Sequence, residues 1–274
     1  EKGLLKIDEP VQTYVPEYPV KQWPVTMRHL MAHTAGIGND SGDEGPLYGT
    51  ACGRPVEALE EFGDDPLRFE PGTEYRYSNY GWILVSAAVE SAAGEPFMRY
   101  MRRHVFEPLG MENTREDSAS EPIDRLAVSY FPRFGADPKY GPDVMRPLDY
   151  SCYAGASAII STPSDLARFM TAVDAGTLLQ PSTVALLQAE TRLPSGNVTG
   201  YGLGWDHEVV TIAGTATPVI GHDGDLLGGT AVSIMKFADH DLIVVVSSNT
   251  SYADTFGLGV KIAEVFARHK ARAR

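Results

Sequence analysis

The stretch FEPGTEYRYSNYG at residues 69–81 carries the clearest structural signal of this sequence. Its Pro-Gly pair predicts a turn. The run 82–93 that follows is almost wholly apolar or small and stops at Gly94, which predicts a buried helix beginning just after Asn79. An extended segment in front of that helix would direct Tyr77 and Asn79 to the same side, because alternate residues of an extended chain share a face.

The Tyr77–Asn79 pair has a functional and a structural interpretation. Acyl transfer by a serine enzyme needs a nucleophile, a base, a donor for the leaving group and an oxyanion hole. A tyrosine serves as the base only where nearby cations hold its phenolate down from an ordinary pKa of about 10. The structural interpretation is a buried tyrosine followed by an asparagine that caps the helix, and the pair alone favours this one.

A second motif, His222-Asp223-Gly224, lies between two predicted strands or at the start of one. The histidine would supply positive charge or a hydrogen bond to the tyrosine. The glycine would let a substrate acyl group lie close to the strand, where backbone N–H groups are natural oxyanion donors. The structural interpretation is a turn with a surface histidine, and it is again preferred for the tripeptide by itself.

Around these motifs the apolar period changes along the chain. The first part predicts helices over residues 27–33 after the N-cap Thr26 and before Gly36, from Pro96 to about Phe106, and after the capping sequence Thr162-Pro163-Ser164-Asp165, with mainly loop over 113–157. The last third predicts strands over Gly202–Val210, Ala213–Ile220, Thr230–Phe237 and Leu242–Ser248. A final amphipathic helix carries Leu258, Ile262, Val265 and Phe266 on one face.

Composition excludes several classes of protein. The 274 residues are 43% apolar and 22% charged, as in ordinary globular chains. A net charge of −13 argues against nucleic acid as a partner, because binding to a phosphate backbone depends on clustered cations. No apolar run approaches the length of a membrane span. The chain opens at Glu1 without a methionine, so its start says nothing about compartment.

Cysteine and histidine spacing gives little support for a disulfide framework or a metal site. Cys52 and Cys152 are the only cysteines; they can pair once, but nothing in the sequence brings them together. His29 and His33 stand four residues apart on a predicted helix, which is metal-ligand spacing. No third ligand is evident, so a structural role is preferred for both, and no cofactor or metal is expected.

Taken together and in this order, the motifs resemble those of the β-lactamase and DD-peptidase superfamily of penicillin-recognising serine hydrolases, in its class C or esterase-like branch. That superfamily combines Ser-x-x-Lys, Tyr-x-Asn and Lys-Thr-Gly or His-x-Gly. The resemblance extends over residues 1–266, through Leu5–Val11, Val25–Gly36 (VTMRHLMAHTAG), 69–81, Phe106–Met111, Ser161–Met170 and Tyr201–Trp205.

The resemblance implies a mixed α/β (α+β) fold: an antiparallel sheet with flanking helices and a helical lobe. It implies hydrolysis of an ester, amide or β-lactam through an acyl-serine. The implied roles are Tyr77 as general base or its relay, Asn79 at the acyl side of the substrate, and His222 in the place of the third motif's cation. Gly224 would line the strand, the backbone N–H of Asp225 would form half of the oxyanion hole, and Tyr153 would flank the substrate cleft.

The nucleophile is the part of the pattern that this sequence lacks. Its only Ser-x-x-Lys, Ser233 to Lys236, follows the third motif and falls in a predicted strand. Residues three apart in a strand face opposite ways, so this match is interpreted as a coincidence. The superfamily places Ser-x-x-Lys, with a helix and two strands, upstream of the residues that begin here.

Three explanations are open. The serine lies on residues outside this chain, or a second polypeptide supplies it, or the chain is a non-catalytic relative that binds a ligand or peptidoglycan. We expect the first, with a single catalytic domain over 1–268, mainly helices and loops over 1–180, the sheet and last helix over 181–268, and a basic tail over 269–274. An isolated chain with an exposed sheet edge is expected to be poorly soluble.

Overall fold

The computed structural model describes residues 1–38, 47–117, 123–133, 138–226 and 229–272. Two compact units make up the chain, and neither is a contiguous half of it. Unit 1 comprises Glu1–Pro122, Leu148–Ser161 and Ala185–Gly204, and unit 2 comprises Ile123–Pro147, Thr162–Val184 and Trp205–Arg274. The single domain expected over residues 1–268 stays a prediction.

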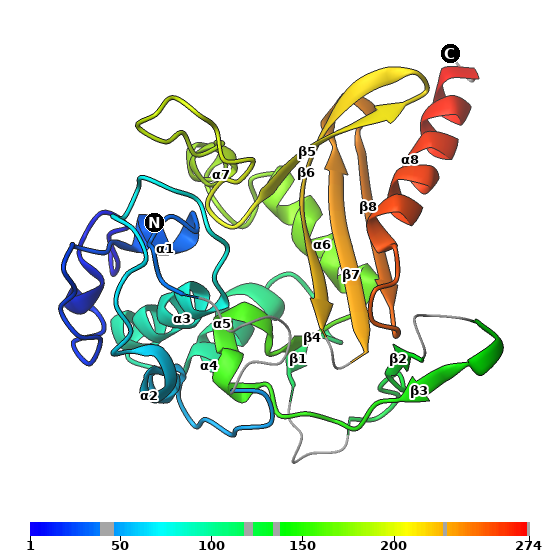
Figure 1. Ribbon diagram of the computed structural model, residues 1–274. Helices are drawn as coiled ribbons and strands as arrows, with labels where there is room; N and C mark the ends of the chain where they lie inside the picture. Colours follow the sequence, from blue (N-terminus) through cyan, green and yellow to red (C-terminus); the bar gives the residue numbers. More distant parts are fainter. Residues whose placement is uncertain (39–46, 118–122, 134–137, 227–228, 273–274) are drawn as a thin grey trace. The chain divides into compact units, whose positions relative to one another are not determined.

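Unit 1 is built from short helices around one long buried helix (Figure 1). Its helical elements are η1 Val11–Thr13, α1 Met27–Met31, η2 Pro55–Ala58, α2 Leu59–Phe62, α3 Asn79–Ala93, α4 Phe97–Met101, the π-helical turn η3 Arg102–Phe106, η5 Ser151–Tyr153 and α5 Ala154–Ser157. The two-residue strand β1, Arg115–Glu116, pairs antiparallel with β4, Ile159–Ile160. The helix α7, Pro181–Gln188, runs from unit 2 into unit 1.

The helix α3 begins and ends as its sequence predicts. Ser78 adopts an extended backbone, and its hydroxyl accepts a hydrogen bond from the N–H of Gly81, which caps the first turn. Gly94 follows the last turn with a φ of +66°, a conformation that glycine adopts without strain. Between these ends, Ile83 and Leu84 are fully buried in the core of unit 1.

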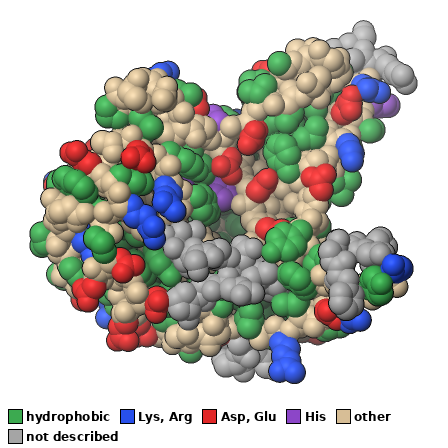
Figure 2. Space-filling model, in the orientation of Figure 1, with side chains coloured by type: hydrophobic (Ala, Val, Ile, Leu, Met, Phe, Trp, Pro, Cys, Tyr) green, Lys and Arg blue, Asp and Glu red, His purple; other side chains and the backbone are tan. Residues whose placement is uncertain are grey.

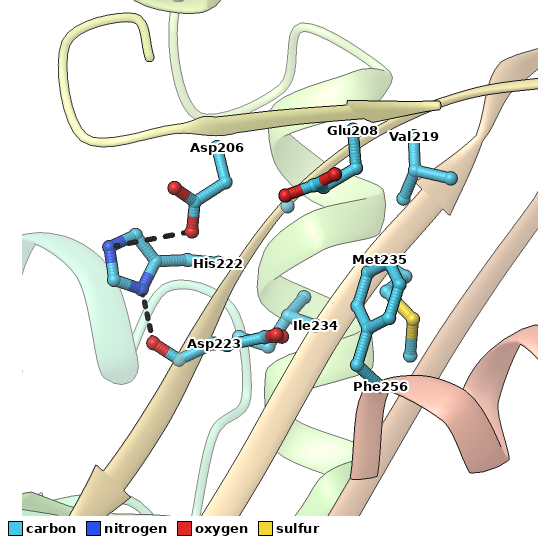
Figure 3. Close-up of a pocket in the computed structure, with 9 residues that line it drawn as sticks. Asp206, Glu208, Val219, His222, Asp223, Ile234, Met235 and Phe256 are labelled. Atoms are coloured by element: carbon cyan, nitrogen blue, oxygen red, sulfur yellow. Dashed lines mark hydrogen bonds and ion pairs between the residues drawn. The ribbon is translucent and has the colours of Figure 1, made fainter. Parts of the chain in front are cut away.

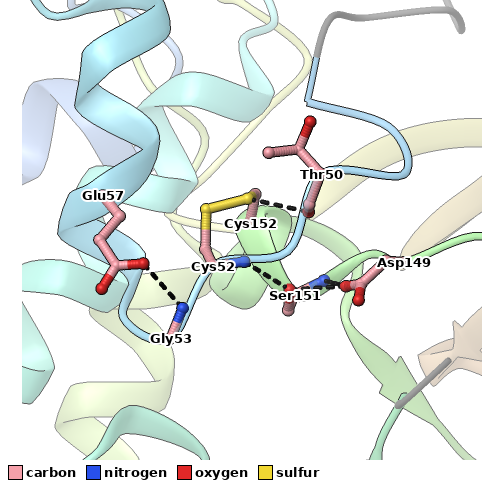
Figure 4. The surroundings of a disulfide bond; sticks show 7 residues. All are labelled: Thr50, Cys52, Gly53, Glu57, Asp149, Ser151 and Cys152. Atoms are coloured by element: carbon pink, nitrogen blue, oxygen red, sulfur yellow. Dashed lines mark hydrogen bonds between the residues drawn. A yellow bond between two sulfur atoms is a disulfide. The ribbon is translucent and has the colours of Figure 1, made fainter. Parts of the chain in front are cut away.

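A disulfide joins Cys52 and Cys152 in unit 1 (Figure 4). The two cysteines are separated by 100 positions, and their Cα atoms lie 4.8 Å apart. Ser151 strengthens the junction, since its hydroxyl accepts from the N–H of Cys52 at 2.9 Å and donates to Asp149 at 2.6 Å. The sequence left this pairing open, and the tertiary structure makes it.

Unit 2 contains a four-stranded antiparallel sheet in the order β5-β6-β7-β8. The strands are β5 Asp206–Ile212, β6 Thr215–Leu226, β7 Thr230–Phe237 and β8 Leu242–Ser248; unit 2 also holds β2 Tyr130–Pro132, η4 Pro138–Tyr140, β3 Pro142–Val144, α6 Pro163–Asp174, η6 Ala238–His240 and α8 Thr255–Arg272. The predicted bounds of β7 and β8 are confirmed. The predicted N-cap of α6 is also confirmed, since the Thr162 hydroxyl accepts from the N–H of Asp165.

The helices α6 and α8 cover opposite faces of this sheet (Figure 1). In β7, Lys236 forms an ion pair with Asp174 of α6, whereas Ser233 bonds to Thr255 of α8. Because residues three apart in a strand face opposite ways, these contacts place one helix on each face. The apolar run in β8 is therefore covered on both sides, as its composition predicts.

The face of α8 that packs on the sheet differs from the one that its large apolar residues suggest. The buried positions are the small residues Gly259, Ala263 and Ala267. A side chain at Gly259 would collide with the Met235 methyl group, so the helix approaches the sheet too closely for a large residue. Val265 and Phe266 are consequently 67% and 58% exposed.

Acidic side chains are spread over the visible face of both units (Figure 2), in keeping with the net charge of −13. Among the helices that the structure describes, none has the length and apolar character needed to span a bilayer. Within the same described ranges, His, Cys, Asp and Glu side chains form no group of three or more suited to a metal ion.

Candidate active site

The Tyr77-Ser78-Asn79 segment does not match its structural interpretation. The capping residue is Ser78, which is 4% exposed and also donates its hydroxyl to the carbonyl oxygen of Gly38 at 2.8 Å. Asn79 is the first residue of α3 rather than its cap. Tyr77 is 39% exposed rather than buried. The segment therefore buries its middle residue for structure and leaves the flanking phenol accessible.

His33 lies directly beneath the exposed tyrosine. Its ring centroid is 4.0 Å from that of Tyr77, with the planes tilted by 31°. The imidazole is 2% exposed, and its Nδ1 accepts the backbone N–H of Ser78 at 3.0 Å. Tyr201 reaches the same ring, with centroids 4.8 Å apart. Sequence reasoning assigned His33 only a structural role and missed this contact; its sole signal was its place in the VTMRHLMAHTAG stretch.

His29, the other histidine of the predicted helix, belongs to the N-cap of α1. Its Nδ1 accepts from the N–H of Thr26 at 3.3 Å, while its own N–H donates to the Thr26 hydroxyl. Burial, followed by the positive charge of Arg28, lowers the pKa of His29. His29 therefore bonds within its own helix start, whereas His33 bonds to a segment 45 positions away.

Tyr153 lies in the core rather than beside an accessible segment. It is 1% exposed in η5, next to the disulfide, and packs against Tyr48 with centroids 4.8 Å apart. A side chain so covered offers no surface to a ligand in this conformation. Its burial argues against the substrate contact expected for it, and we do not carry Tyr153 into the proposal below.

The His222-Asp223-Gly224 motif is in the interior of β6, not in a turn or at the start of a strand. Its partners in β7 are Ile234, Ser233 and Val232. The preceding residue explains the close pairing, because any side chain at Gly221 would collide with the carbonyl oxygen of Ile234. This glycine was overlooked in the sequence, although its position next to His222 is a usable signal.

Along β6, successive residues direct their backbone N–H and C=O groups alternately toward β7 and toward the β5 side, and this continues past Gly221. β5 ends its pairing where Asp206 opposes Gly221. In an antiparallel ladder successive residues direct their N–H and C=O groups to opposite sides, so Asp223 and Asp225 direct theirs away from β7. The N–H of Asp223 donates to the Asp206 carboxylate. The N–H of Asp225 points to the same side as that of Asp223, and its role as an oxyanion donor stays a prediction.

His222 is placed between a carbonyl and a carboxylate (Figure 3). Its Nδ1 lies 2.6 Å from the carbonyl oxygen of Asp223, and because a carbonyl only accepts, Nδ1 carries the hydrogen. Its Nε2 lies 4.0 Å from Asp206, so an ion pair forms there only when the imidazole is protonated. Burial raises the pKa of the Asp206 carboxyl, although His222 and the Asp223 N–H act in the opposite sense.

A small cavity of about 30 Å³ adjoins this group, between Asp206 and Glu208 of β5 and Phe256 of α8 (Figure 3). Such a volume accommodates water rather than an acyl substrate. Burial also raises the pKa of Asp223, opposed by a hydrogen bond from Ser233. The cavity is therefore a small acidic pocket beside the motif and does not by itself make a substrate site.

The single Ser-x-x-Lys of the chain lacks the geometry of a nucleophile and its base. Ser233 is fully buried and bonds to the Thr255 hydroxyl at 2.8 Å, while Lys236 faces the other side of β7 toward Asp174. The prediction that this match falls in a strand, with its two residues on opposite faces, is confirmed.

The predicted site residues thus form two local groups. Tyr77 and Asn79 lie together at the start of α3 in unit 1, and His222, Gly224 and Asp225 lie together on β6 in unit 2. The convergence of the two groups on one substrate stays a prediction.

Comparison with known proteins gives a consistent family. The model of the family described as Beta-lactamase matches residues 1–266. Penicillin-binding protein 4* of Bacillus subtilis (strain 168) is 26% identical over 262 residues, covering 91% of this chain and 56% of that protein. Esterase EstB of Burkholderia gladioli is 27% identical over 299 residues, covering 93% of this chain and 74% of the esterase.

Solved structures share the fold. The D-stereospecific amidohydrolase from Streptomyces sp. superposes with a TM-score of 0.77 at 21% identity, covering 96% of this chain and 80% of that one. The predicted fold class, an antiparallel sheet with flanking helices and a helical lobe, is confirmed. The chain spans 56% of penicillin-binding protein 4* and 48% of the putative penicillin-binding protein PbpX of the same organism, about half their length. Because the family match extends over residues 1–266, this chain belongs to the beta-lactamase family.

Proposed function

We propose that this chain forms the larger part of a serine acyl hydrolase in which Tyr77 is the general base. The observation that carries the proposal is that Ser78 caps the helix start and is buried there, whereas Tyr77 beside it stays exposed. The phenol of Tyr77 is 39% exposed and packs on the buried imidazole of His33. A substrate can therefore reach this phenol.

The proposed reaction has two steps. A serine hydroxyl attacks the substrate carbonyl while Tyr77 takes its proton, and the same phenol then protonates the leaving amine or alcohol. Water hydrolyses the acyl-serine by the reverse path. Asn79 would bind the acyl-side amide or carbonyl, His222 would hold the phenolate through a hydrogen bond or positive charge, and the Asp225 N–H would stabilise the oxyanion beside Gly224.

The nucleophilic serine of this proposal lies on polypeptide outside these 274 residues. The buried position of Ser233, on the opposite side of its strand from Lys236, supports that assignment. Substrates are proposed to be esters, amides or β-lactams of small acyl groups. Relatives named as penicillin-binding proteins, an esterase and a D-amino acid amidase span this range.

The test is an assay of the intact protein that contains this chain, with the 274-residue chain alone in parallel. Nitrocefin, short p-nitrophenyl esters and a D-alanine p-nitroanilide are the probes. Tyr77→Phe should lower kcat/KM by about 10²–10⁴-fold. Tyr80→Phe is the matched control, because it also removes a tyrosine hydroxyl. Tyr80 is a buried residue of α3 whose ring stacks on Phe62 of α2. Near-normal turnover by Tyr77→Phe would remove Tyr77 from the mechanism.

A fluorophosphonate probe tests the nucleophile separately, because it bonds covalently to reactive serines. The labelled peptide should map outside residues 1–274, and a label on any serine within them would overturn the assignment. Ligand binding with neither turnover nor labelling would instead identify a non-catalytic relative.

A further inference from the structure

His33 contacts Tyr77 and the backbone on both sides of it. The imidazole and phenol rings are 4.0 Å apart between centroids. The backbone oxygen of His33 accepts the N–H of Arg76 at 2.8 Å, and its Nδ1 accepts the N–H of Ser78 at 3.0 Å. One residue therefore binds the backbone N–H groups of both neighbours of Tyr77, Arg76 and Ser78, and also contacts its ring.

The hydrogen-bond pattern defines how the imidazole is held. Since Nδ1 accepts from Ser78, it presents its lone pair, and a neutral ring then carries its hydrogen on Nε2. The indole Nε1 of Trp82 lies 3.3 Å from that Nε2. A neutral imidazole has only one such lone pair, so only one of these two N–H groups can donate to it, and the shorter contact is the one from Ser78.

The backbone of His33 is itself unusual. Its φ is +55°, in the left-handed region that residues with a side chain seldom adopt. Met31 ends α1 two residues earlier, and this turn directs the imidazole under the 75–78 segment. A residue that is held in a disfavoured conformation and is 2% exposed is constrained on every side by its surroundings.

We infer that His33 is a positioning residue for Tyr77, fixing the direction of the phenol through ring contact and through the backbone N–H groups of its two neighbours, Arg76 and Ser78. The inference rests on the proposed function, in which Tyr77 is the base. His33 touches neither substrate nor nucleophile in this role. Its effect is to keep the phenol oxygen within reach of the proton that it accepts, and small displacements of such a group reduce turnover strongly.

Two substitutions separate the ring from the acceptor. His33→Asn keeps a residue that tolerates positive φ and an oxygen near the Nδ1 position, but it removes the stacked ring. His33→Phe keeps a ring and loses the acceptor for Ser78. His29→Asn is the matched control, because it makes the same change four residues earlier, in α1, where the side chain contacts Thr26.

The first measurement is independent of turnover. The intact protein is labelled with 3-fluorotyrosine, and the ¹⁹F signal of Tyr77 is assigned by its loss in Tyr77→Phe. His33→Asn should shift that signal, because the ring current of the imidazole is gone, whereas His29→Asn should leave it in place. His33→Phe should retain a shift from a stacked ring.

The second measurement is steady-state kinetics on unlabelled protein. His33→Asn should lower kcat by about 10- to 100-fold, while KM changes by less than about threefold. His33→Phe should also lose turnover, and His29→Asn should keep it. If His33 had only a structural role, His33→Asn would lower the amount of folded protein. The protein that did fold would then keep its kcat per active molecule.

Two outcomes would overturn the inference directly: an unmoved Tyr77 signal in His33→Asn, or a moved signal with unchanged kcat. A wild-type protein without turnover would remove the proposed function and the positioning role with it. The fluorine signal distinguishes these failures, because it reports the contact between the rings whether or not the protein is active.

Discussion

Removal of the Cys52–Cys152 disulfide should destabilise unit 1 substantially. The bond closes a loop of 100 residues. Loop-closure entropy assigns such a cross-link about 4–5 kcal/mol, and removal of native disulfides costs about 2–5 kcal/mol. We expect a loss of at least about 2 kcal/mol, since the loop contains α3, whose buried residues are part of the core of unit 1.

The assay is urea unfolding of wild type and Cys52→Ala/Cys152→Ala, each with and without a thiol reductant. With a slope of about 2 kcal/mol per M, the wild-type midpoint should fall by roughly 1 M or more on reduction. The double variant should have the lower midpoint already and should not respond to reductant. Titration of thiols in the unfolded, unreduced wild type should find none. Two titratable thiols, or a midpoint that reduction leaves in place, would refute the reasoning.

Three further outcomes follow from local features of the structure. In thermal unfolding, Gly36→Ala should lower the free energy of unfolding by clearly more than the roughly 1 kcal/mol expected of Gly94→Ala. Both glycines have a positive φ, but only at Gly36 would an added Cβ collide with the Phe69 carbonyl oxygen. Equal losses of stability would contradict this. Burial raises the pKa of Asp206 above 3.8, so its contribution to stability is present below that pH and lost as the pH rises through the folded pKa. In urea unfolding at a series of pH values, Asp206→Asn should therefore reduce the fall in the free energy of unfolding as the pH rises above 3.8. An unchanged slope would contradict a raised pKa of Asp206. Phe266→Lys should reduce concentration-dependent association in light scattering with little change in Tm, because the ring is 58% exposed; a large fall in Tm would mean that the ring is buried in solution.

Local signals in the sequence were sufficient for much of the secondary structure. The start of α3, the capping of α6 and the bounds of β7 and β8 follow from residues within one or two turns of each boundary. Tyr77 and Asn79 were also found from sequence, because their spacing and the helix behind them are contiguous in the chain. Family membership followed from motifs of the same short kind.

Contacts between distant segments decided the remainder. The composition of His222-Asp223-Gly224 favours a turn, but pairing with β7 holds this motif inside β6. The large apolar residues of α8 suggest its buried face, yet Leu258, Val265 and Phe266 are exposed and only Ile262 of that set packs on the core. At Gly259 the helix lies so close to Met235 that an added side chain would collide with its methyl group.

The sequence by itself determined many of the helices and strands, the family, and the Tyr77–Asn79 pair of the candidate site, whereas the exposure of the Tyr77 phenol came from the structure. Only the tertiary structure joined Cys52 to Cys152 and brought His33 to a backbone 45 positions away. Capping and periodicity act within a few residues, whereas these contacts depend on how helices and strands pack once they have formed.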